Sequence, residues 1–297
     1  MNHFLYITWD LGSPSPGIDL GFFVIRYYSL MWALAFYVGL ETMKRIVFKT
    51  EKVDPSYLEP FLFHTIIGCM IGARLGHVIF YQTELLWEHP LAVLLPISPD
   101  PDGSVFGILK GYTFSGFAGL ASHGATLGMI ISTYIFHRKY PKLNLYWLID
   151  RLILTIPIGG ALIRIGNFFN SEIIGKVANY PWCVNFIQAA EFDGRPRHPT
   201  QLYEALGYII LFFILVWIYY KTDKRRYRGW MFGFFFMVLW LIRFFVEFYK
   251  EPQGEEALAK WFNLGLNNGQ LLSIPFIILG IVMMITAKKY THPPVKE

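Results

Sequence analysis

Four short strings of this sequence combine arginine, histidine or carboxylate residues with small and apolar neighbours. They are Ser122-His123-Gly124-Ala125, Arg164 to Glu172, Arg197 to Glu204 and Arg243 to Glu247. Guanidinium groups bind phosphate through two parallel hydrogen bonds and keep their charge at any working pH. Histidine adds a group that exchanges protons near neutral pH. The residue types therefore indicate chemistry on a substrate that contains phosphate, with an acid–base group beside it.

The spacing within the strings places several of these groups on one helix face. Arg164 and Asn167 are three residues apart, and Arg243 and Glu247 are four apart, so each pair meets across one helical turn. The run that contains His198 has a proline and polar residues at a predicted helix start. These spacings predict that the strings contribute side chains to common surfaces.

Each string also has a simpler structural interpretation when it is taken alone. His123 has the alternative of a packing histidine, and Arg243 with Glu247 the alternative of a structural ion pair. The run from 197 to 204 also fits a helix cap, and Gly166 and Gly175 also fit packing or turn positions. The positions of the strings along the whole chain are therefore needed to choose between these interpretations.

The composition indicates a chain whose solvent is mostly lipid. The 297 residues are 54% hydrophobic and 16% charged, whereas soluble domains have about 25% charged residues. Mean hydropathy is +0.39. The formal net charge is +5, but the basic residues lie in short loops between apolar runs, so we expect no nucleic-acid partner. The fold class predicted is an all-α polytopic membrane protein.

Seven apolar segments are long enough to cross about 30 Å of hydrocarbon. They lie near 21–42, 59–81, 113–137, 145–167, 201–220, 229–249 and 269–287. The run 91–97 is too short to cross and is predicted to be interfacial or re-entrant. Residues 1–20 lack a basic segment and contain two aspartates and two prolines, so no cleaved signal peptide is expected.

Basic residues predict the orientation of these segments. The loops after the first, third and fifth segments and the C-terminal tail contain fifteen Lys and Arg residues, and the alternate loops contain six. The first set is therefore predicted to be cytoplasmic, with the N-terminus outside and the C-terminus inside. We expect residues 1–297 to form a single integral membrane domain. The long outer loops, about 82–112, 168–200 and 250–268, are expected to form a cap on the periplasmic side.

This orientation places ionisable and amide side chains of four segments at one depth, in the outer leaflet. They are Arg74 and His77, then His123, then Arg164 and Asn167, and finally Arg243 and Glu247. A charge at the bilayer centre costs roughly 2.5–3.5 kcal/mol, so such residues are functional-site candidates. The phosphate expected at this depth is a phospholipid headgroup. Asp150 and Arg151 fall near the inner end instead, where a structural or snorkelling role is favoured.

The two cysteines, Cys69 and Cys183, show no disulfide framework or metal-ligand spacing. Two unpaired structural cysteines is the favoured interpretation, and a disulfide between them stays open. No metal site is predicted.

The strings together resemble the bacterial prolipoprotein diacylglyceryl transferases, in order, from about Tyr27 to Pro275. The densest match is Arg164 to Gly175, which is similar to the family signature, and the run Gly269 to Pro275 is also similar. The resemblance implies transfer of a diacylglyceryl group from phosphatidylglycerol to the lipobox cysteine of a prolipoprotein signal peptide. It also implies glycerol phosphate release, no cofactor, seven helices, and action at the periplasmic face of the inner (cytoplasmic) membrane.

The resemblance also implies roles for individual residues. His123 looks like the essential histidine, and Arg164 and Arg243 look like the essential arginines that bind phospholipid; these three are the candidate catalytic residues. The candidate substrate-binding residues are Tyr28, Arg74, Gly124, Asn167, Glu172, Gly175, His198 and Glu247.

The sequence departs from the family pattern at three positions. Ala125 replaces a second glycine after His123-Gly124, Leu239 replaces a tyrosine four residues before Arg243, and His77 stands where tyrosine is common. No tyrosine role is therefore expected in the sixth segment.

Two other classes of function remain as alternatives. A transporter or lipid flippase would need polar residues at both leaflets and an inverted repeat, and neither is clearly visible. A seven-helix receptor would not require arginines clustered in the outer half. Release of glycerol phosphate distinguishes the transferase from both.

Overall fold

The computed structural model describes residues 7–13, 16–20, 24–105, 107–114, 119–189, 193–251 and 265–290. These residues are mainly helical. Contacts divide the chain into two compact units, one formed by Met1–Lys52 with Ile149–Pro294 and the other by Val53–Leu148 with Val295–Glu297. Helix α7 (Leu145–Leu152) begins in the second unit and ends in the first.

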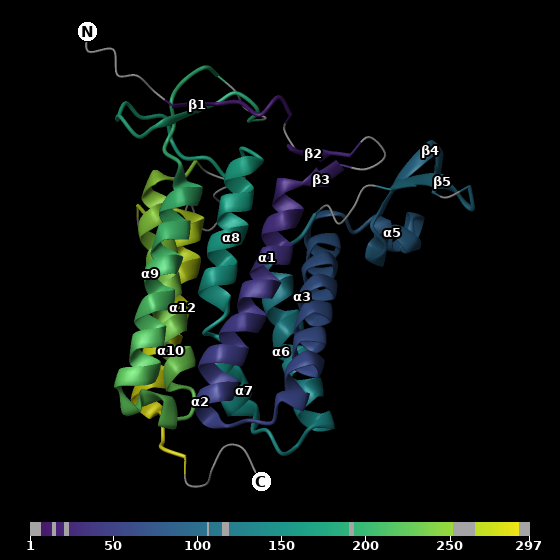
Figure 1. The fold of residues 1–297 in the computed structure, drawn as a ribbon. Helices are drawn as coiled ribbons and strands as arrows, with labels where there is room; N and C mark the ends of the chain where they lie inside the picture. Colours follow the sequence, from purple (N-terminus) through teal and green to yellow (C-terminus); the bar gives the residue numbers. More distant parts are fainter. Residues whose placement is uncertain are drawn as a thin grey trace. The chain divides into compact units, whose positions relative to one another are not determined.

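The first unit is a row of helices in which each packs against the next. The order is α1 (Tyr27–Thr42), α8 (Ile156–Phe169), α9 (Thr200–Lys221), α10 (Trp230–Val246) and α12 (Asn268–Thr286). Figure 1 shows α1, α8 and α9 as neighbours. The helix α1 continues without a break through the π-helix η1 (Met43–Phe48) into α2 (Lys49–Glu51). A 3₁₀ turn, η4 (Glu247–Tyr249), extends α10, and another, η3 (Asp223–Arg226), follows α9.

Short strands of the first unit lie at one end of these helices (Figure 1). Strand β1 (Ile7–Trp9) pairs in parallel with β6 (Val184–Phe186), and β2 (Gly17–Asp19) pairs antiparallel with β3 (Val24–Arg26). Trp9 packs against Phe168 at the end of α8, with 4.5 Å between ring centroids. Strand β1 is therefore anchored directly on the helix that contains Arg164.

In the second unit, α3 (Leu58–Tyr81) packs along α6 (Ser122–Lys139). A 3₁₀ turn, η2 (Pro55–Tyr57), precedes α3. Between the two long helices come α4 (Leu85–Glu88), α5 (Pro90–Leu94) and the antiparallel strands β4 (Ile97–Val105) and β5 (Leu109–Phe114). The glycines on α3 and α6 lie backbone to backbone: a Cβ on Gly72 or Gly124 would overlap the other helix, and so would one on Gly68 or Gly128. Small residues allow this close approach.

Apolar surfaces support a membrane location. By length and composition, four helical spans of the described residues could cross a membrane: Pro55–Tyr81, Thr200–Lys221, Trp230–Tyr249 and Asn268–Thr286. The pair α7 and α8 forms a fifth if the bent pair is one span. On α9, Leu206, Phe213 and Trp217 are each at least 60% exposed, whereas Glu204, Tyr208 and Leu211 face the interior. The helix therefore has one face suited to lipid and another buried in protein.

Three of the predicted segments differ from the structure. The first, expected from residue 21, is helical only from Tyr27, because residues 24–26 form β3. The fourth is not continuous: α7 and α8 meet at a 42° bend, because Pro157 lies in the first turn of α8 and has no N–H to continue the helical ladder. The third does not begin at residue 113, since residues 109–114 form β5 and α6 starts at Ser122. Gly119, with φ of 68°, and the extended Ala121 separate the two elements. The crossings expected at 21–42 and 113–137 remain predictions.

A buried polar network lies near the junction of α7, α9 and α10. Arg151 donates from Nε to Glu51 at 2.6 Å and from Nη2 to the carbonyl of Arg225 at 2.9 Å. Tyr219 donates its hydroxyl proton to the same Glu51 carboxylate at 2.7 Å. The carboxylate of Asp150 accepts from the backbone N–H groups of Gly229 and Phe232 at 2.7 and 3.0 Å. The structural role expected for Asp150 and Arg151 agrees with these contacts.

Replacing Asp150 by alanine should destabilise the fold by roughly 2–3 kcal/mol, because two buried N–H groups at the start of α10 lose a charged acceptor. The variant Asp150→Asn would keep one acceptor oxygen and should cost less. Thermal unfolding of the purified protein in detergent measures the effect. Asp223→Ala is the control, since Asp223 is exposed and its ion pair with Arg226 lies at the surface. Equal melting temperatures for the wild type and the Asp150→Ala variant would contradict the capping role.

Candidate active site

The end of α8 brings Arg164, Asn167 and Glu172 into one chain of hydrogen bonds. Arg164 Nη1 donates to Asn167 Oδ1 at 3.4 Å, and Asn167 Nδ2 donates to Glu172 Oε2 at 2.9 Å. Asn170 Nδ2 donates to the other carboxylate oxygen of Glu172 at 3.0 Å. Glu172 therefore fixes the amide of Asn167, and Asn167 in turn supports the guanidinium.

An unusual backbone turns Glu172 back toward α8. Ser171 and Ile173 have φ values of 55° and 59°, a left-handed conformation that non-glycine residues seldom adopt. Thr200 Oγ1 donates to the carbonyl of Ile173 at 2.9 Å, and Gln201 Nε2 donates to that of Glu172, so the start of α9 holds the turn. Strained residues held by surrounding contacts are common at functional sites.

The most buried charged group beside Arg164 is Glu204, which has 1% of its surface exposed. It forms an ion pair with Arg164 Nε through one oxygen, and Lys250 Nζ lies 3.3 Å from the other. Lys250 is itself 4% exposed and also lies 3.8 Å from Glu247. We call Arg164, Glu204, Arg243, Glu247 and Lys250 the charged cluster. Its members come from α8, α9, α10 and the turn η4 with the residue after it.

Arg243 belongs to this cluster but is held differently. Its guanidinium lies 5.3 Å from the centre of the Trp240 ring, and its charge acts on Glu204 and Lys250. Within the described part of the chain, no hydrogen bond or ion pair holds the Arg243 guanidinium. The ion pair that the spacing predicted between Arg243 and Glu247 does not form among the described residues. The reason is that α10 ends at Val246 and Glu247 begins a tighter 3₁₀ turn.

Tyrosines flank Arg164 on both sides. Tyr28 on α1 packs its ring on Gly166, where a Cβ would come within 2.7 Å of the ring, and its hydroxyl neighbours Asn167. Tyr208 on α9 is buried and lies beside Arg164. It packs in the same apolar cluster as Leu239. A tyrosine hydroxyl is therefore present beside Arg164 although position 239 is leucine.

Gly175 and His198 form a tight junction just outside this cluster. Gly175 N donates to the carbonyl of His198 at 2.9 Å, and a Cβ at Gly175 would meet His198 and the Tyr249 carbonyl at 2.6–2.7 Å. The ring of His198 hydrogen-bonds Tyr203 OH at 2.9 Å and packs against Tyr249. Burial lowers the pKa of His198, which favours the neutral imidazole. Both residues hold the loop against α9 and η4.

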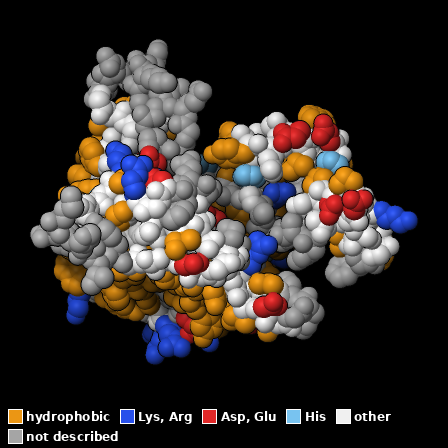
Figure 2. All heavy atoms as spheres, turned by 90° about the horizontal axis from the view of Figure 1, so that it is seen from above, with side chains coloured by type: hydrophobic (Ala, Val, Ile, Leu, Met, Phe, Trp, Pro, Cys, Tyr) orange, Lys and Arg blue, Asp and Glu red, His pale blue; other side chains and the backbone are white. Residues whose placement is uncertain are grey.

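A separate set of ion pairs between side chains fixes the loop that precedes α9. Arg197 pairs with Asp193 at 2.8 Å and with Glu251 at 3.1 Å. Hydrogen bonds from Arg195 and Arg197 lower the pKa of Asp193 to about 2. Figure 2 looks onto the end of the molecule that has the strands and shows basic side chains beside acidic ones at several places.

In the second unit, His123 lies in the first turn of α6. The sequence alone placed it deeper within a longer helix. Gly124 is buried against Gly72 at the contact of α6 with α3. Ala121 N donates to the carbonyl of Ala73 at 2.9 Å, so the segment that leads to His123 is fixed to α3.

Replacing Gly124 by alanine tests whether its role is packing or substrate binding. The new methyl group would overlap the Gly72 carbonyl, so we expect a loss of roughly 1–3 kcal/mol in stability. Gly128→Ala is a matched control, because its methyl group would overlap the Gly68 carbonyl in the same way. Thermal unfolding and activity are measured for both variants. Loss of activity by Gly124→Ala alone, at equal stability, would refute a purely packing role.

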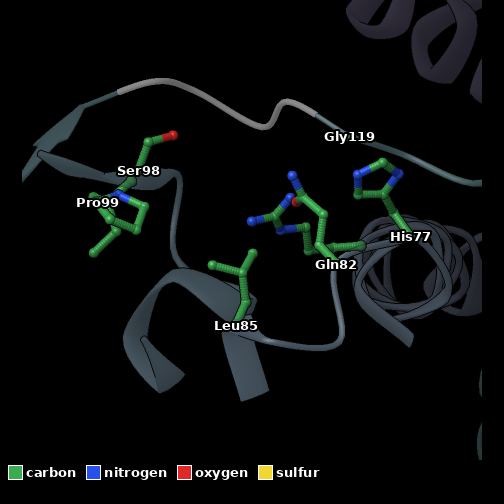
Figure 3. Close-up of a pocket in the computed structure, with 8 residues that line it drawn as sticks. His77, Gln82, Leu85, Ser98, Pro99 and Gly119 are labelled. Carbon is green, nitrogen blue, oxygen red and sulfur yellow. The ribbon is translucent and has the colours of Figure 1, made fainter. Parts of the chain in front are cut away.

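Arg74 fixes the short helix α5. Its Nε and Nη2 donate to the carbonyls of Val93 and Ala92 at 3.2 and 2.6 Å, at the C-terminal end of that helix. Arg74 also lines a cavity of about 270 Å³. Figure 3 shows His77 beneath Gly119 on one side of this cavity, Ser98 and Pro99 on the opposite side, and Gln82 pointing between them.

Glu204, Tyr208 and Lys250 were missed by the sequence reasoning. Glu204 belongs to a run that also fits a helix cap, and Lys250 was counted among loop residues. Glu204 lies in the first two turns of an otherwise apolar helix, and this position alone marks it as a candidate functional residue.

Helices with lipid-suited faces around a buried cluster of arginine, lysine and carboxylate side chains define a membrane protein with a charged interior site. Residues 17–286 match the family model described as prolipoprotein diacylglyceryl transferase. The chain therefore belongs to the prolipoprotein diacylglyceryl transferase family and is a transferase.

Related proteins named phosphatidylglycerol–prolipoprotein diacylglyceryl transferase align along almost their whole length. The protein from Bacteroides fragilis is 39% identical over 284 residues, which cover 95% of this chain and 96% of the relative. Those from Chloroherpeton thalassium and Porphyromonas gingivalis are 36% and 35% identical, and each alignment covers 96% of this chain and 95% of the relative.

Proposed function

We propose that this protein transfers the diacylglyceryl group of phosphatidylglycerol to the lipobox cysteine of a prolipoprotein signal peptide. The cysteine thiolate attacks the glycerol carbon that bears the phosphate. A C–S bond forms, the C–O bond breaks, and the phosphate oxygen leaves with the electron pair as glycerol phosphate. The thiol proton passes first to a base and then to solvent. The products are a thioether and a phosphate monoester.

The observation that supports this most strongly is the charged cluster. Arg164 is positioned by Glu204 and Asn167, while the guanidinium of Arg243 has no ion pair among the described residues. Two neighbouring guanidinium groups, of which Arg164 is held in place by its partners, suit a phosphodiester and can stabilise the charge that develops on the leaving oxygen. We assign phosphate binding to Arg164 and Arg243. Glu172 supports Arg164 through Asn167, and Glu247 supplies a second negative charge to the same cluster.

The remaining candidates have other roles in the proposed reaction. His123 is the proposed base for the thiol, which must become a thiolate to attack. Tyr28 supports Arg164 and Asn167, and Gly175 with His198 shapes the loop next to the cluster. Gly124 and Arg74 hold the second unit together, and Arg74 adds positive charge to its cavity for an anionic headgroup.

We also propose seven membrane crossings, with the N-terminus outside and the site toward the periplasmic side of the inner membrane. The helix from Tyr27 to Glu51 is continuous and would be about 37 Å long, and α6 about 27 Å. Both lengths suit a bilayer with a hydrocarbon core of about 30 Å. The asymmetry of basic residues supports the orientation.

Transfer of labelled diacylglyceryl from phosphatidylglycerol to a lipobox peptide, by the purified protein in detergent, tests the function. The control peptide has alanine in place of the lipobox cysteine. We expect label only on the cysteine peptide, with an equal amount of glycerol phosphate released. Movement of lipid without glycerol phosphate release would refute the transferase and favour a transporter.

A further inference from the structure

Glu204 places a negative charge where the proposed substrate needs positive charge. Its carboxylate lies between Arg164 and Lys250, and Arg243 acts on it as well. A buried carboxylate beside a phosphate site weakens the binding of every anion there, because like charges repel strongly in a low dielectric. The position of Glu204 therefore requires a reason beyond substrate affinity.

The proposed reaction supplies such a reason, since it changes the charge of the bound phosphate. The substrate is a phosphodiester with one negative charge. The product is a phosphate monoester, whose second pKa is about 6, so at neutral pH it is mostly a dianion. A site with only the three cations of the cluster would bind this product more tightly than the substrate. The negative charges of the two carboxylates in the cluster reduce this preference for the product over the substrate.

The geometry singles out Glu204 rather than the other carboxylates nearby. Glu204 contacts Arg164 and Lys250 directly and is 1% exposed. Glu247 lies 3.8 Å from Lys250 and is more exposed, with 15% of its side chain accessible. Glu172 is bound by the amides of Asn167 and Asn170. Glu204 is thus the carboxylate most strongly coupled to the phosphate-binding side chains.

We propose that Glu204 is a positioning residue whose charge also limits the affinity of the site for dianionic phosphate monoesters and so promotes product release. The proposal rests on the proposed function. Glu204 itself does not contact the reacting atoms. Its effect passes through Arg164 and Lys250, which it orients and whose positive charge it partly neutralises.

The test compares Glu204→Gln and Glu204→Asp with the wild type. Glutamine keeps the shape and one acceptor oxygen but loses the charge, whereas aspartate keeps the charge. Binding of glycerol phosphate is measured by calorimetry on the detergent-purified protein without any turnover. Steady-state transfer then gives kcat, the KM for phosphatidylglycerol and the inhibition constant of glycerol phosphate. Glu251→Gln is the matched control, because it removes a carboxylate from the ion pair with Arg197 outside the cluster.

For Glu204→Gln we expect glycerol phosphate to bind about tenfold more tightly, with a lower kcat and a KM that does not rise. Glu204→Asp and Glu251→Gln should bind glycerol phosphate as the wild type does. A merely structural role predicts the opposite for Glu204→Gln, namely weaker product binding and a higher KM. That result, or unchanged binding, would overturn the proposal. Absence of transfer by the wild type itself would instead refute the proposed function.

Discussion

Replacing Arg164 by alanine is expected to lower the rate of diacylglyceryl transfer by about a thousandfold, or about 4 kcal/mol in transition-state stabilisation. The side chain is fixed by Glu204 and Asn167, so its guanidinium is already positioned when the phosphate arrives. Arg164→Lys keeps the charge but loses the paired donors, and should retain a small fraction of the activity. Initial rates of peptide labelling measure the effect.

The control for Arg164 is Arg195→Ala. Arg195 is also an arginine of the first unit, but its side chain is 63% exposed and pairs only with Asp193 among the described residues. We expect it to keep nearly full activity. Thermal unfolding of every variant separates a loss of chemistry from a loss of fold. Full turnover by folded Arg164→Ala protein would show that the phosphate binds elsewhere.

Replacing His123 by glutamine is expected to lower the transfer rate by about 10²–10⁴-fold, the range typical of a lost general base. Glutamine has a similar size and can still form hydrogen bonds, so the fold should persist. The pH–rate profile is the more specific measurement. If His123 accepts the thiol proton, the decline in rate toward acidic pH should disappear in the variant.

His64→Gln is the matched control for His123. His64 lies on α3 in the same unit and its ring contacts the carbonyl of Pro60 at 2.6 Å, within its own helix. Its replacement should leave both the rate and the pH profile unchanged. Activity of His123→Gln with an unaltered pH profile would assign the base to another group.

The sequence contained enough to predict the helices whose apolar runs are uninterrupted. The segments expected at 59–81, 201–220 and 269–287 match α3, α9 and α12 within one residue at each end. Hydrophobicity alone does not show where a helix breaks inside an apolar run. The bend before Pro157 and the late start at Ser122 depend on a missing N–H and on the backbone of Gly119, which a count of apolar residues does not detect.

The sequence predicts the part of the candidate site whose residues lie close together in the chain. Arg164, Asn167 and Glu172 are close in the chain and lie together in the structure. Glu204 and Lys250 are 46 residues apart, and their contact depends on how α9 and η4 pack, which no local pattern encodes. Arg243 and Glu247 show the converse, since their spacing predicted a pair that the end of the helix prevents.

The contact between Asp150 and the start of α10 also constrains how the chain is assembled. Asp150 is synthesised 79 residues before its hydrogen-bond partner Gly229. Glu51 is synthesised 168 residues before its partner Tyr219. While the ribosome is still translating α9, Asp150 lacks both of the backbone donors that it binds in the finished protein. The first unit therefore completes its packing only after α10 has emerged. A chain that stops before residue 229 ends with this acid lacking both backbone donors.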